Sequence, residues 1–189
     1  MSLPTVSTSQ PEASSTLVPR LFHISDRPGI ELFEPRTAPG ARGPEQPCVW
    51  AVEETRLPFY FLPRDCPRVC FFAERDSIPA DVQTLLGLTA ARMVVAVETG
   101  WLDRIRRESL WLYELPSDRF TLFDAGAGHW IATESVLPIG VEQIDDLLAR
   151  MLSYDVEFRI TPSLWPLRDA VVASTLGFSC IRMRNARPR

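Results

Sequence analysis

Short runs of apolar residues, separated by turns, dominate the chain and predict more strands than helices. Residues 154–160 alternate apolar and charged side chains, which is typical of a strand with one buried face. Residues 69–73 are apolar at every position, which fits a strand buried on both faces. The predicted strands are residues 21–25, 48–52, 69–73, 92–98, 110–115, 120–123, 129–133, 154–160 and 178–183.

Helical signals are fewer. Apolar residues recur at helical spacing across residues 141–152, which predicts one helix over that whole range. Residues 78–86 are predicted to form a helix with Ser77 as its N-cap, and residues 164–176 another with Ser163 as its N-cap.

The order of these elements predicts the fold class. Strands outnumber helices and do not alternate regularly with them, and residues 110–133 are predicted to form a β-meander. We therefore expect an α+β protein with a single domain at residues 20–189, built on a mixed, mostly antiparallel sheet with a few flanking helices. Residues 1–19 are rich in Ser, Thr and Pro and are predicted to be a disordered tail.

The composition argues against several classes of function. The chain has 189 residues and a formal net charge of -4, whereas nucleic-acid binding draws its affinity from a basic surface. It contains no lysine, so Schiff-base chemistry and a phosphate-binding P-loop lysine are excluded. Its four cysteines and two histidines lack metal-ligand spacing, and no apolar run approaches the roughly 20 residues of a membrane span. We expect a cytoplasmic protein with no metal site, no nucleic-acid partner and no membrane segment.

The least ordinary stretch is LPRDCPR, at residues 62–68, between two predicted strands. Arg64 and Arg68 flank Asp65 there, and the planar guanidinium group suits phosphate or carboxylate ligands. With Arg36, these two arginines are the predicted anion ligands. The alternative is an internal lock, in which Asp65 holds the arginines and fixes the turn.

Cys66 lies in the same turn. Nearby arginines would lower the pKa of its thiol and make it reactive, whereas Asp65 would oppose that shift. Because no histidine partner follows in the sequence, a nucleophilic role is not predicted.

Candidate reactive groups are a histidine and a carboxylate. His23 and Ser25 lie two residues apart on a predicted strand, so their side chains share a face and could hold a ribose. A histidine bound by backbone groups is the structural alternative. Glu157 could stabilise a developing cation, or it could form a cross-pair with Arg159 on a solvated sheet face. His129 is predicted to lie in a surface loop or at a strand edge.

Five fragments stand out together: LFHIS at residues 21–25, FEPR at 33–36, VWA at 49–51, PRDCPR at 63–68 and RMRNA at 182–186. Together they resemble a bacterial family of unknown function across nearly the whole chain after the tail. That resemblance implies no particular activity.

The opening LFHIS, followed by an isoleucine, a phenylalanine, a Pro-Arg pair and VWA, also resembles the start of ADP-ribosyltransferase-like folds, which include RNA 2′-phosphotransferases. This resemblance implies NAD as a cofactor. It also implies that an early-strand histidine, here His23, contacts the NAD ribose and that a late-strand glutamate, here Glu157, orients it. Tyr60 is the nearest candidate for the middle residue of the motif.

Three hypotheses follow, and spatial proximity separates them. An ADP-ribosyltransferase-like protein that binds NAD or another phosphate-bearing nucleotide needs His23 and Glu157 in one cleft. A non-catalytic module that binds a small anion needs only the convergence of Arg36, Arg64 and Arg68. A protein-interaction domain needs neither arrangement.

Overall fold

The protein is described by a computed structural model, which gives the structure of residues 19–37 and 44–189. The predicted disordered tail at residues 1–19 lies outside the described residues except for Pro19. Its separation from a domain at residues 20–189 therefore stays a prediction. Within the described ranges, no helix is long and apolar enough to span a membrane.

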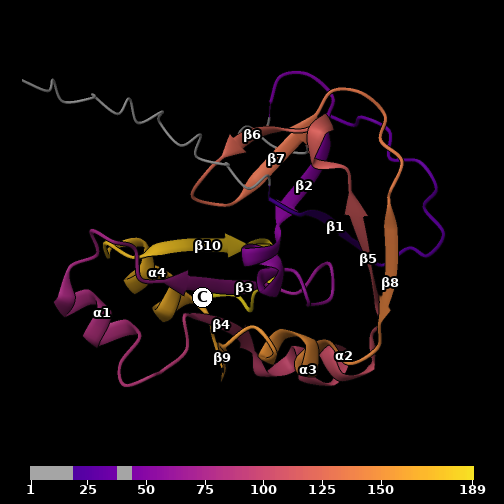
Figure 1. The fold of residues 1–189 in the computed structure, drawn as a ribbon. Helices are drawn as coiled ribbons and strands as arrows, with labels where there is room; N and C mark the ends of the chain where they lie inside the picture. The colour runs from indigo at the N-terminus through magenta and orange to yellow at the C-terminus, as the bar shows by residue number, and fades with distance from the viewer. Residues whose placement is uncertain (1–18, 38–43) are drawn as a thin grey trace, which may run out of the picture.

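Two β-sheets form the framework (Figure 1). The larger sheet has six antiparallel strands in the order β6-β7-β2-β1-β5-β8, so the first two strands of the chain lie at its centre. Its strands are β1 (Leu21–Ser25), β2 (Val49–Glu53), β5 (Leu110–Leu115), β6 (Thr121–Asp124), β7 (His129–Ala132) and β8 (Gly140–Ile144).

The smaller sheet has four strands in the order β10-β3-β4-β9, with β4 and β9 parallel and the other neighbours antiparallel. The expected α+β class with mixed, mostly antiparallel strands is confirmed, although the strands form two sheets instead of one. The four strands are β3 (Arg68–Phe72), β4 (Met93–Glu98), β9 (Val156–Thr161) and β10 (Gly177–Ile181).

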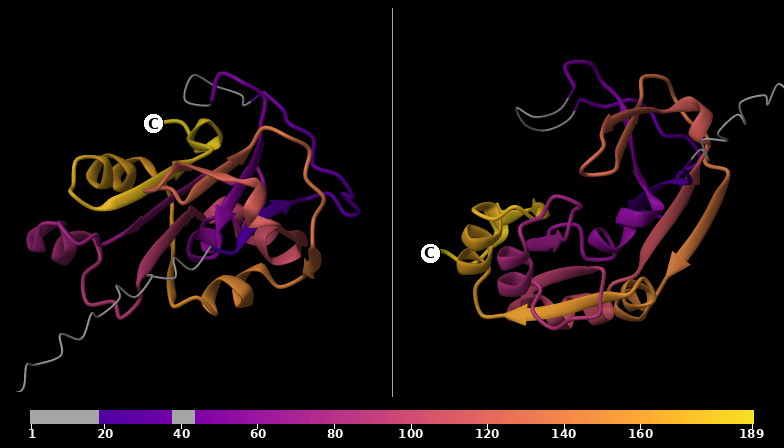
Figure 2. Two further views of the ribbon diagram at one scale, coloured as in Figure 1. Left: turned by 45° about the horizontal axis from the view of Figure 1, so that its top comes forward. Right: turned by 60° about the vertical axis from the view of Figure 1, so that its left-hand side comes forward.

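Short helices flank the sheets. In Figure 1, α1 and α4 lie beside the four-stranded sheet, and α2 and α3 lie next to each other at the bottom. Figure 2 shows β10 and α4 on the opposite side of the molecule from β8. The α-helices are α1 (Pro79–Leu85), α2 (Leu102–Arg107), α3 (Leu147–Leu152) and α4 (Trp165–Val172), and the 3₁₀ helices are η1 (Glu54–Phe59), η2 (Thr99–Trp101), η3 (Ser117–Arg119) and η4 (Met183–Asn185).

The largest apolar core lies between the two sheets, where η1, α2 and α3 also contribute side chains. β3 is buried on both faces, as its apolar run predicts, because Cys70 faces this core while Val69 and Phe71 face a second core beneath α1 and α4. A third cluster on the outer face of the six-stranded sheet includes Phe33 and Val136, which form a β-bridge.

The predicted helix at residues 141–152 is wrong in its first half. Residues 140–144 form β8, which pairs with β5, and only residues 147–152 form a helix. The boundary is set by Asp146, whose carboxylate accepts a hydrogen bond from the backbone N–H of Ala149 at 2.9 Å and so caps α3. The apolar residues at helical spacing therefore belong to two elements.

The predicted β-meander over residues 110–133 is also wrong. β6 pairs with β7, but β5 pairs with β1 and β8 instead of β6. The intervening η3 does not reverse the chain into a hairpin, and the positions on either side of β5 are taken by β1 and the edge strand β8. The predicted cap at Ser77 is wrong too, because Ile78 precedes α1 in an extended conformation and Ser77 donates instead to the carbonyl of Thr175 at 3.0 Å.

Candidate functional site

The central strands β1 and β2 separate soon after they pair. Their ladder covers only Leu21 opposite Glu53 and Phe22 opposite Val52, whereas β1 and β5 pair along the whole of β1. Continuing the same register would place Ile24 opposite Trp50, but the pairing has ended by then. An opening in the six-stranded sheet results.

A pocket of about 350 Å³ lies at this opening, between β1 and β2 on one side and the start of β3 and the end of β10 on the other. Its charged lining comprises three arginines, Arg64, Arg68 and Arg182, and one carboxylate, Asp26. Phe22, Ile24, Val52, Leu62, Leu110 and Ile181 supply apolar lining. The pocket therefore combines an excess of positive charge with an apolar wall.

Arg68 is the most deeply buried of these cations. It begins β3, and only 4% of its surface is exposed. Its Nη1 donates to the carbonyl oxygens of Cys66 at 3.0 Å and Pro63 at 3.4 Å, whereas its buried Nε has no hydrogen-bond partner among the described residues. Burial lowers the pKa of the Arg68 guanidinium, and no ion pair to it is found in the described part of the chain.

Two further arginines form the rim. Arg64 is exposed and pairs with the carboxylate of Asp26 at 3.4 Å. Arg182 follows β10 with φ of 54°, in the left-handed region that an arginine rarely adopts, and its Nε donates to the carbonyl of Arg64 at 3.2 Å. Asp65 is exposed and pairs with neither neighbouring arginine, so the alternative of an internal lock through Asp65 is wrong.

His23 bridges the gap between the separated strands. Its Nδ1 lies 2.9 Å from the carbonyl oxygen of Trp50, and because a carbonyl can only accept, Nδ1 carries the proton and the neutral ring keeps an unprotonated Nε2. Burial lowers the pKa of His23, the Trp50 hydrogen bond opposes that shift, and Arg64 and Arg36 add to it. The imidazole is therefore neutral at neutral pH.

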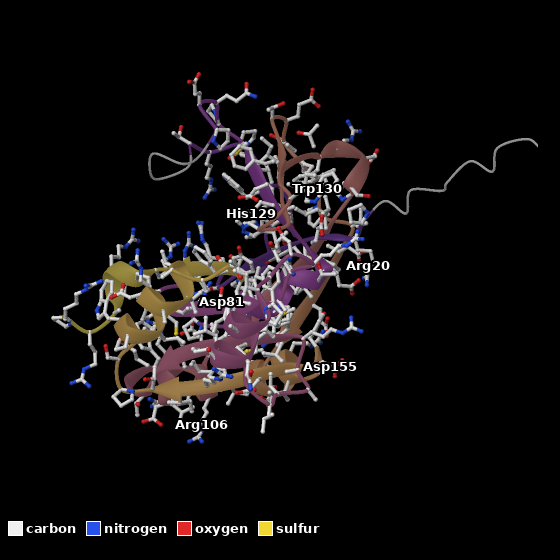
Figure 3. The ribbon with its side chains drawn as sticks, turned by 90° about the vertical axis from the view of Figure 1, so that its left-hand side faces the viewer. Arg20, Asp81, Arg106, His129, Trp130 and Asp155 are labelled. Atoms are coloured by element: carbon white, nitrogen blue, oxygen red, sulfur yellow. The ribbon has the colours of Figure 1, made fainter. Side chains whose placement is uncertain are left out.

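A second histidine lines the same pocket. His129, labelled in Figure 3, is the first residue of β7, and its Nε2 lies 2.6 Å from the hydroxyl of Tyr60. Burial lowers the pKa of His129, although Asp124 opposes that shift, and burial raises the pKa of Tyr60 to about 12. The Arg68 guanidinium lies 5.7 Å from the centre of the Tyr60 ring. Both members of the pair are thus neutral at pH 7, and the tautomer of His129 sets which of the two donates.

The pocket brings together most of the residues singled out from the sequence. His23, Ser25, Tyr60, Arg64 and Arg68 all line it. The hydroxyl of Ser25 accepts a hydrogen bond from the backbone N–H of Arg27 at 3.1 Å.

Two of the predicted site residues are not part of the lining. Arg36 is exposed and forms a β-bridge with Cys48, although its charge contributes to the lowered pKa of His23. Glu157 lies on β9, at the edge of the other sheet, where it accepts a hydrogen bond from Arg159 at 2.6 Å. Arg159 in turn donates to the carbonyls of Leu85 and Leu86. The expectation that His23 and Glu157 share one cleft is not met.

Cys66 is fully buried beside the pocket and is not among its lining residues. Burial raises the pKa of its thiol to about 12, and this effect exceeds the opposing effect of Arg68. The thiol is therefore protonated at neutral pH, which agrees with the sequence-based view that Cys66 is not a nucleophile.

Comparison with known protein families shows which family the chain belongs to. The model of a family described as "Family of unknown function (DUF6886)" matches residues 22–186. The chain belongs to this family. The match includes every residue that lines the pocket, and the resemblance to a family of unknown function is confirmed. No curated protein and no solved structure matches the chain, so the resemblance to ADP-ribosyltransferases finds no support.

Two pocket residues in the part matched by the DUF6886 family model were missed from the sequence. His129 was expected at a surface or strand edge because it follows the Gly126-Ala127-Gly128 turn, but β7 pairs with β2 and carries it into the pocket. Arg182 lies in the RMRNA fragment near the end of the chain, and nothing local links that fragment to the PRDCPR turn. The pairing of β10 with β3 would have been needed to find it.

Proposed function

We propose that the protein binds a small phosphate-bearing ligand, with a nucleotide as the leading candidate, in the pocket between the two sheets. The observation that carries the proposal is the buried guanidinium of Arg68, which pairs with no carboxylate among the residues that the structure describes. Carbonyl oxygens bond to its Nη1 but do not neutralise its charge, and a buried charge without a counter-ion is costly, so an anion that pairs with the guanidinium is the best explanation. Planar guanidinium groups bind phosphate oxygens through two parallel hydrogen bonds.

The shape and lining of the pocket support a ligand with an apolar part as well as an anion. A volume of about 350 Å³ falls at the small end of the usual range for ligand pockets. Trp50 and Tyr60 add aromatic surface to the apolar wall. A mononucleotide or another small organic phosphate fits these features better than a free inorganic ion does.

The proposal concerns binding and does not extend to ADP-ribosyl transfer. Cleavage of NAD would need a carboxylate beside the ribose to stabilise an oxocarbenium-like state. Glu157, the candidate for that role, is held by Arg159 on the edge strand β9 and is absent from the pocket lining. Asp26 is the carboxylate that lines the pocket, and it pairs with Arg64.

Thermal unfolding and isothermal titration with AMP, NAD, inorganic phosphate and adenosine test the proposal. A ligand at about 100 times its Kd adds roughly 2.7 kcal/mol to the free energy of unfolding. AMP should stabilise the protein and adenosine should not, because adenosine lacks the anion. If neither AMP, NAD nor phosphate binds at millimolar concentration, the proposal fails.

Arg68→Met, with Arg56→Met as its matched control, locates the binding. Arg56 is partly buried, its Nε, like that of Arg68, lacks a partner in the described residues, and its guanidinium stacks 3.9 Å from the ring centre of Phe72, outside this pocket. Arg68→Met should abolish the response to AMP, whereas Arg56→Met should keep it. An unchanged response in Arg68→Met would place the ligand elsewhere.

A further inference from the structure

Arg68 and Arg182 reach the pocket from neighbouring positions on two paired strands. In the antiparallel pairing of β10 with β3, which lie side by side in Figure 1, Ile181 is opposite Arg68, and Arg182 is the next residue along the chain. Both arginines line the pocket. Burial lowers the pKa of the Arg68 guanidinium, and the positive charge of Arg182 adds to that shift. The two like charges therefore act on each other within one site, and a single anionic group between them would relieve their repulsion.

Arg182 is held in place without being neutralised. Its Nε donates to the carbonyl oxygen of Arg64 at 3.2 Å, which fixes the guanidinium but leaves its charge uncompensated. No carboxylate pairs with Arg182 within residues 19–37 and 44–189. Its backbone has φ of 54°, a conformation that costs free energy for a residue with a side chain and that persists where the surrounding structure requires it.

The other ionisable groups of the pocket lining add no net charge. Arg64 is the third arginine, and the carboxylate of Asp26 pairs with it at 3.4 Å. The two histidines and the tyrosine of the lining are neutral at pH 7, because burial lowers the pKa of each imidazole and raises the pKa of the phenol. Arg68 and Arg182 are thus left as two positive charges that no lining group compensates.

We propose that Arg68 and Arg182 together bind one dianionic group, so that Arg182 selects terminal phosphate monoesters over singly charged ligands. This inference rests on the proposed function of the pocket. A guanidinium binds phosphate oxygens through parallel hydrogen bonds, and a terminal phosphate presents three oxygens that two guanidinium groups can share.

The charge of the ligand follows from the charge of the pocket. A phosphate monoester carries close to two negative charges at pH 7, since its second pKa is about 6. A phosphate diester or a sulfate ester carries one, so it would leave one of the two guanidinium groups without a counter-ion. The pocket should therefore distinguish ligands of the same shape by their charge.

A purely structural role for Arg182 is the alternative. In that case Arg182 would serve only to hold the turn through the carbonyl of Arg64, and loss of this hydrogen bond would weaken the binding of every ligand by the same factor. Loss of a charge that contacts the ligand weakens the binding of a dianion more than that of a monoanion. The ratio of two affinities therefore separates the two roles.

AMP and adenosine 5′-sulfate share the nucleoside and differ in the charge of the terminal group. In titration calorimetry at pH 7, wild-type protein should bind AMP about tenfold more tightly or better, the factor expected from one charged hydrogen bond. Arg182→Gln should bind AMP about tenfold more weakly than wild type and should lose the preference for AMP over the sulfate.

Ribose 5-phosphate carries the same dianion without a base. Whichever of AMP and ribose 5-phosphate binds wild-type protein more tightly identifies a nucleotide or a sugar phosphate as the source of the dianion. In either case the binding should weaken about tenfold in Arg182→Gln.

Three variants serve as controls. Arg182→Lys keeps the charge and should keep the preference for AMP over the sulfate. Arg184→Gln removes an exposed arginine of the same segment that does not line the pocket, and it should bind both ligands as wild type does. Asn185→Ala removes the hydrogen bond to the carbonyl of Asp65 at 2.7 Å, so it loosens the same joint without a change of charge and should leave the affinity ratio unchanged.

The possible outcomes separate the two claims. If no phosphate-bearing ligand binds wild-type protein, the proposed function fails and this inference fails with it. If AMP binds but adenosine 5′-sulfate binds equally well, only this inference is overturned, and that comparison needs no variant. A preference for AMP that persists in Arg182→Gln would overturn it as well. A thermal melt of each variant establishes that it is folded before titration.

Discussion

Arg182 donates a hydrogen bond from Nε to the carbonyl oxygen of Arg64 over 3.2 Å, across a separation of 118 residues in the chain. Asn185 makes a parallel connection to the carbonyl of Asp65 at 2.7 Å. The segment after β10 therefore holds the backbone of the arginine-bearing turn in place. The rim of the pocket is a joint between these two segments, which explains why an arginine is kept in a left-handed conformation there.

Arg68→Met should raise or preserve the stability of the empty protein while it removes ligand binding. The substitution removes a buried cation that has no carboxylate partner in the described ranges, a defect that costs about 1–3 kcal/mol or more. The lost hydrogen bonds to Cys66 and Pro63 offset part of that gain. Urea unfolding in a buffer without phosphate or sulfate measures the change. A fall of more than about 2 kcal/mol would mean that Arg68 is a structural residue.

Asp26→Asn should tighten binding of AMP. The carboxylate of Asp26 pairs with Arg64 at the rim and competes there with the ligand. Because the pair is largely exposed, it contributes about 0.2–1 kcal/mol, which corresponds to an affinity gain of about 1.4- to fivefold. Asp103→Asn, an exposed change on α2 away from the pocket, serves as the control. Weaker binding of AMP to Asp26→Asn would show that the carboxylate contacts the ligand favourably.

Stability should fall as the pH drops through the range around 6.5 because of the two histidines. Burial lowers the pKa of His23 and of His129 below the usual value of 6.5. The unfolded chain therefore binds more protons than the folded protein below about pH 6.5. Consequently, the free energy of unfolding decreases as the pH drops through 6.5 and levels off below the folded pKa values.

The double variant His23→Gln/His129→Gln should flatten this slope in urea melts across the same range. The carboxyls of Glu114 and Glu157, whose pKa values are lowered by their arginine partners, contribute stability that is lost only at more acidic pH. An equally steep slope in the double variant would assign the effect to other groups.

Phe71→Ala should cost far more stability than Phe158→Ala. Phe71 is fully buried on β3, and truncation of such a residue costs about 3–5 kcal/mol. Phe158 is only partly buried on β9, although its alternating pattern predicts a core position. We expect Phe158→Ala to lower the free energy of unfolding by less than about 3 kcal/mol. Urea melts of both variants measure the difference, and equal losses would contradict the burial of β9.

Cys180 should react with iodoacetamide before the other three cysteines. It is partly exposed on β10, whereas Cys48, Cys66 and Cys70 are buried. Burial also raises the pKa of Cys66 and Cys70, so their reactive thiolate forms are scarce at neutral pH. Peptide mass spectrometry after timed alkylation gives the order. Early labelling of Cys66 would show that the arginine turn opens frequently.

The sequence predicted most strands but not their partners. Apolar runs such as residues 69–73 identify strands, because a strand that is buried on both faces has apolar side chains at successive positions. Pairing is not local. The hydrophobic spacing of residues 141–152 fits a helix equally well, and only the place of β8 beside β5 decides for a strand. The cap at Asp146 is a local signal, and it marks the correct start of α3.

The candidate site was predicted to a similar extent. The arginine turn and His23 stand out by residue type alone, and the fold brings them together. Glu157 was chosen as a late-strand carboxylate, but strand order puts it on the outer edge of the second sheet. His129 and Arg182 reach the pocket through the β2–β7 and β3–β10 pairings, which no spacing in the sequence reveals.

The joint between Arg182 and Arg64 also bears on when the protein becomes competent during its synthesis. The six-stranded sheet can be completed once the chain has been made as far as Ile144, because all its strands lie before that residue. The pocket needs β10 and Arg182, which a ribosome making about 5–20 residues per second adds some seconds later. A nascent chain would thus carry His23 and His129 on a formed sheet while it still lacks the rim. Ligand could then stabilise only nearly finished molecules and would not assist the early stages of folding.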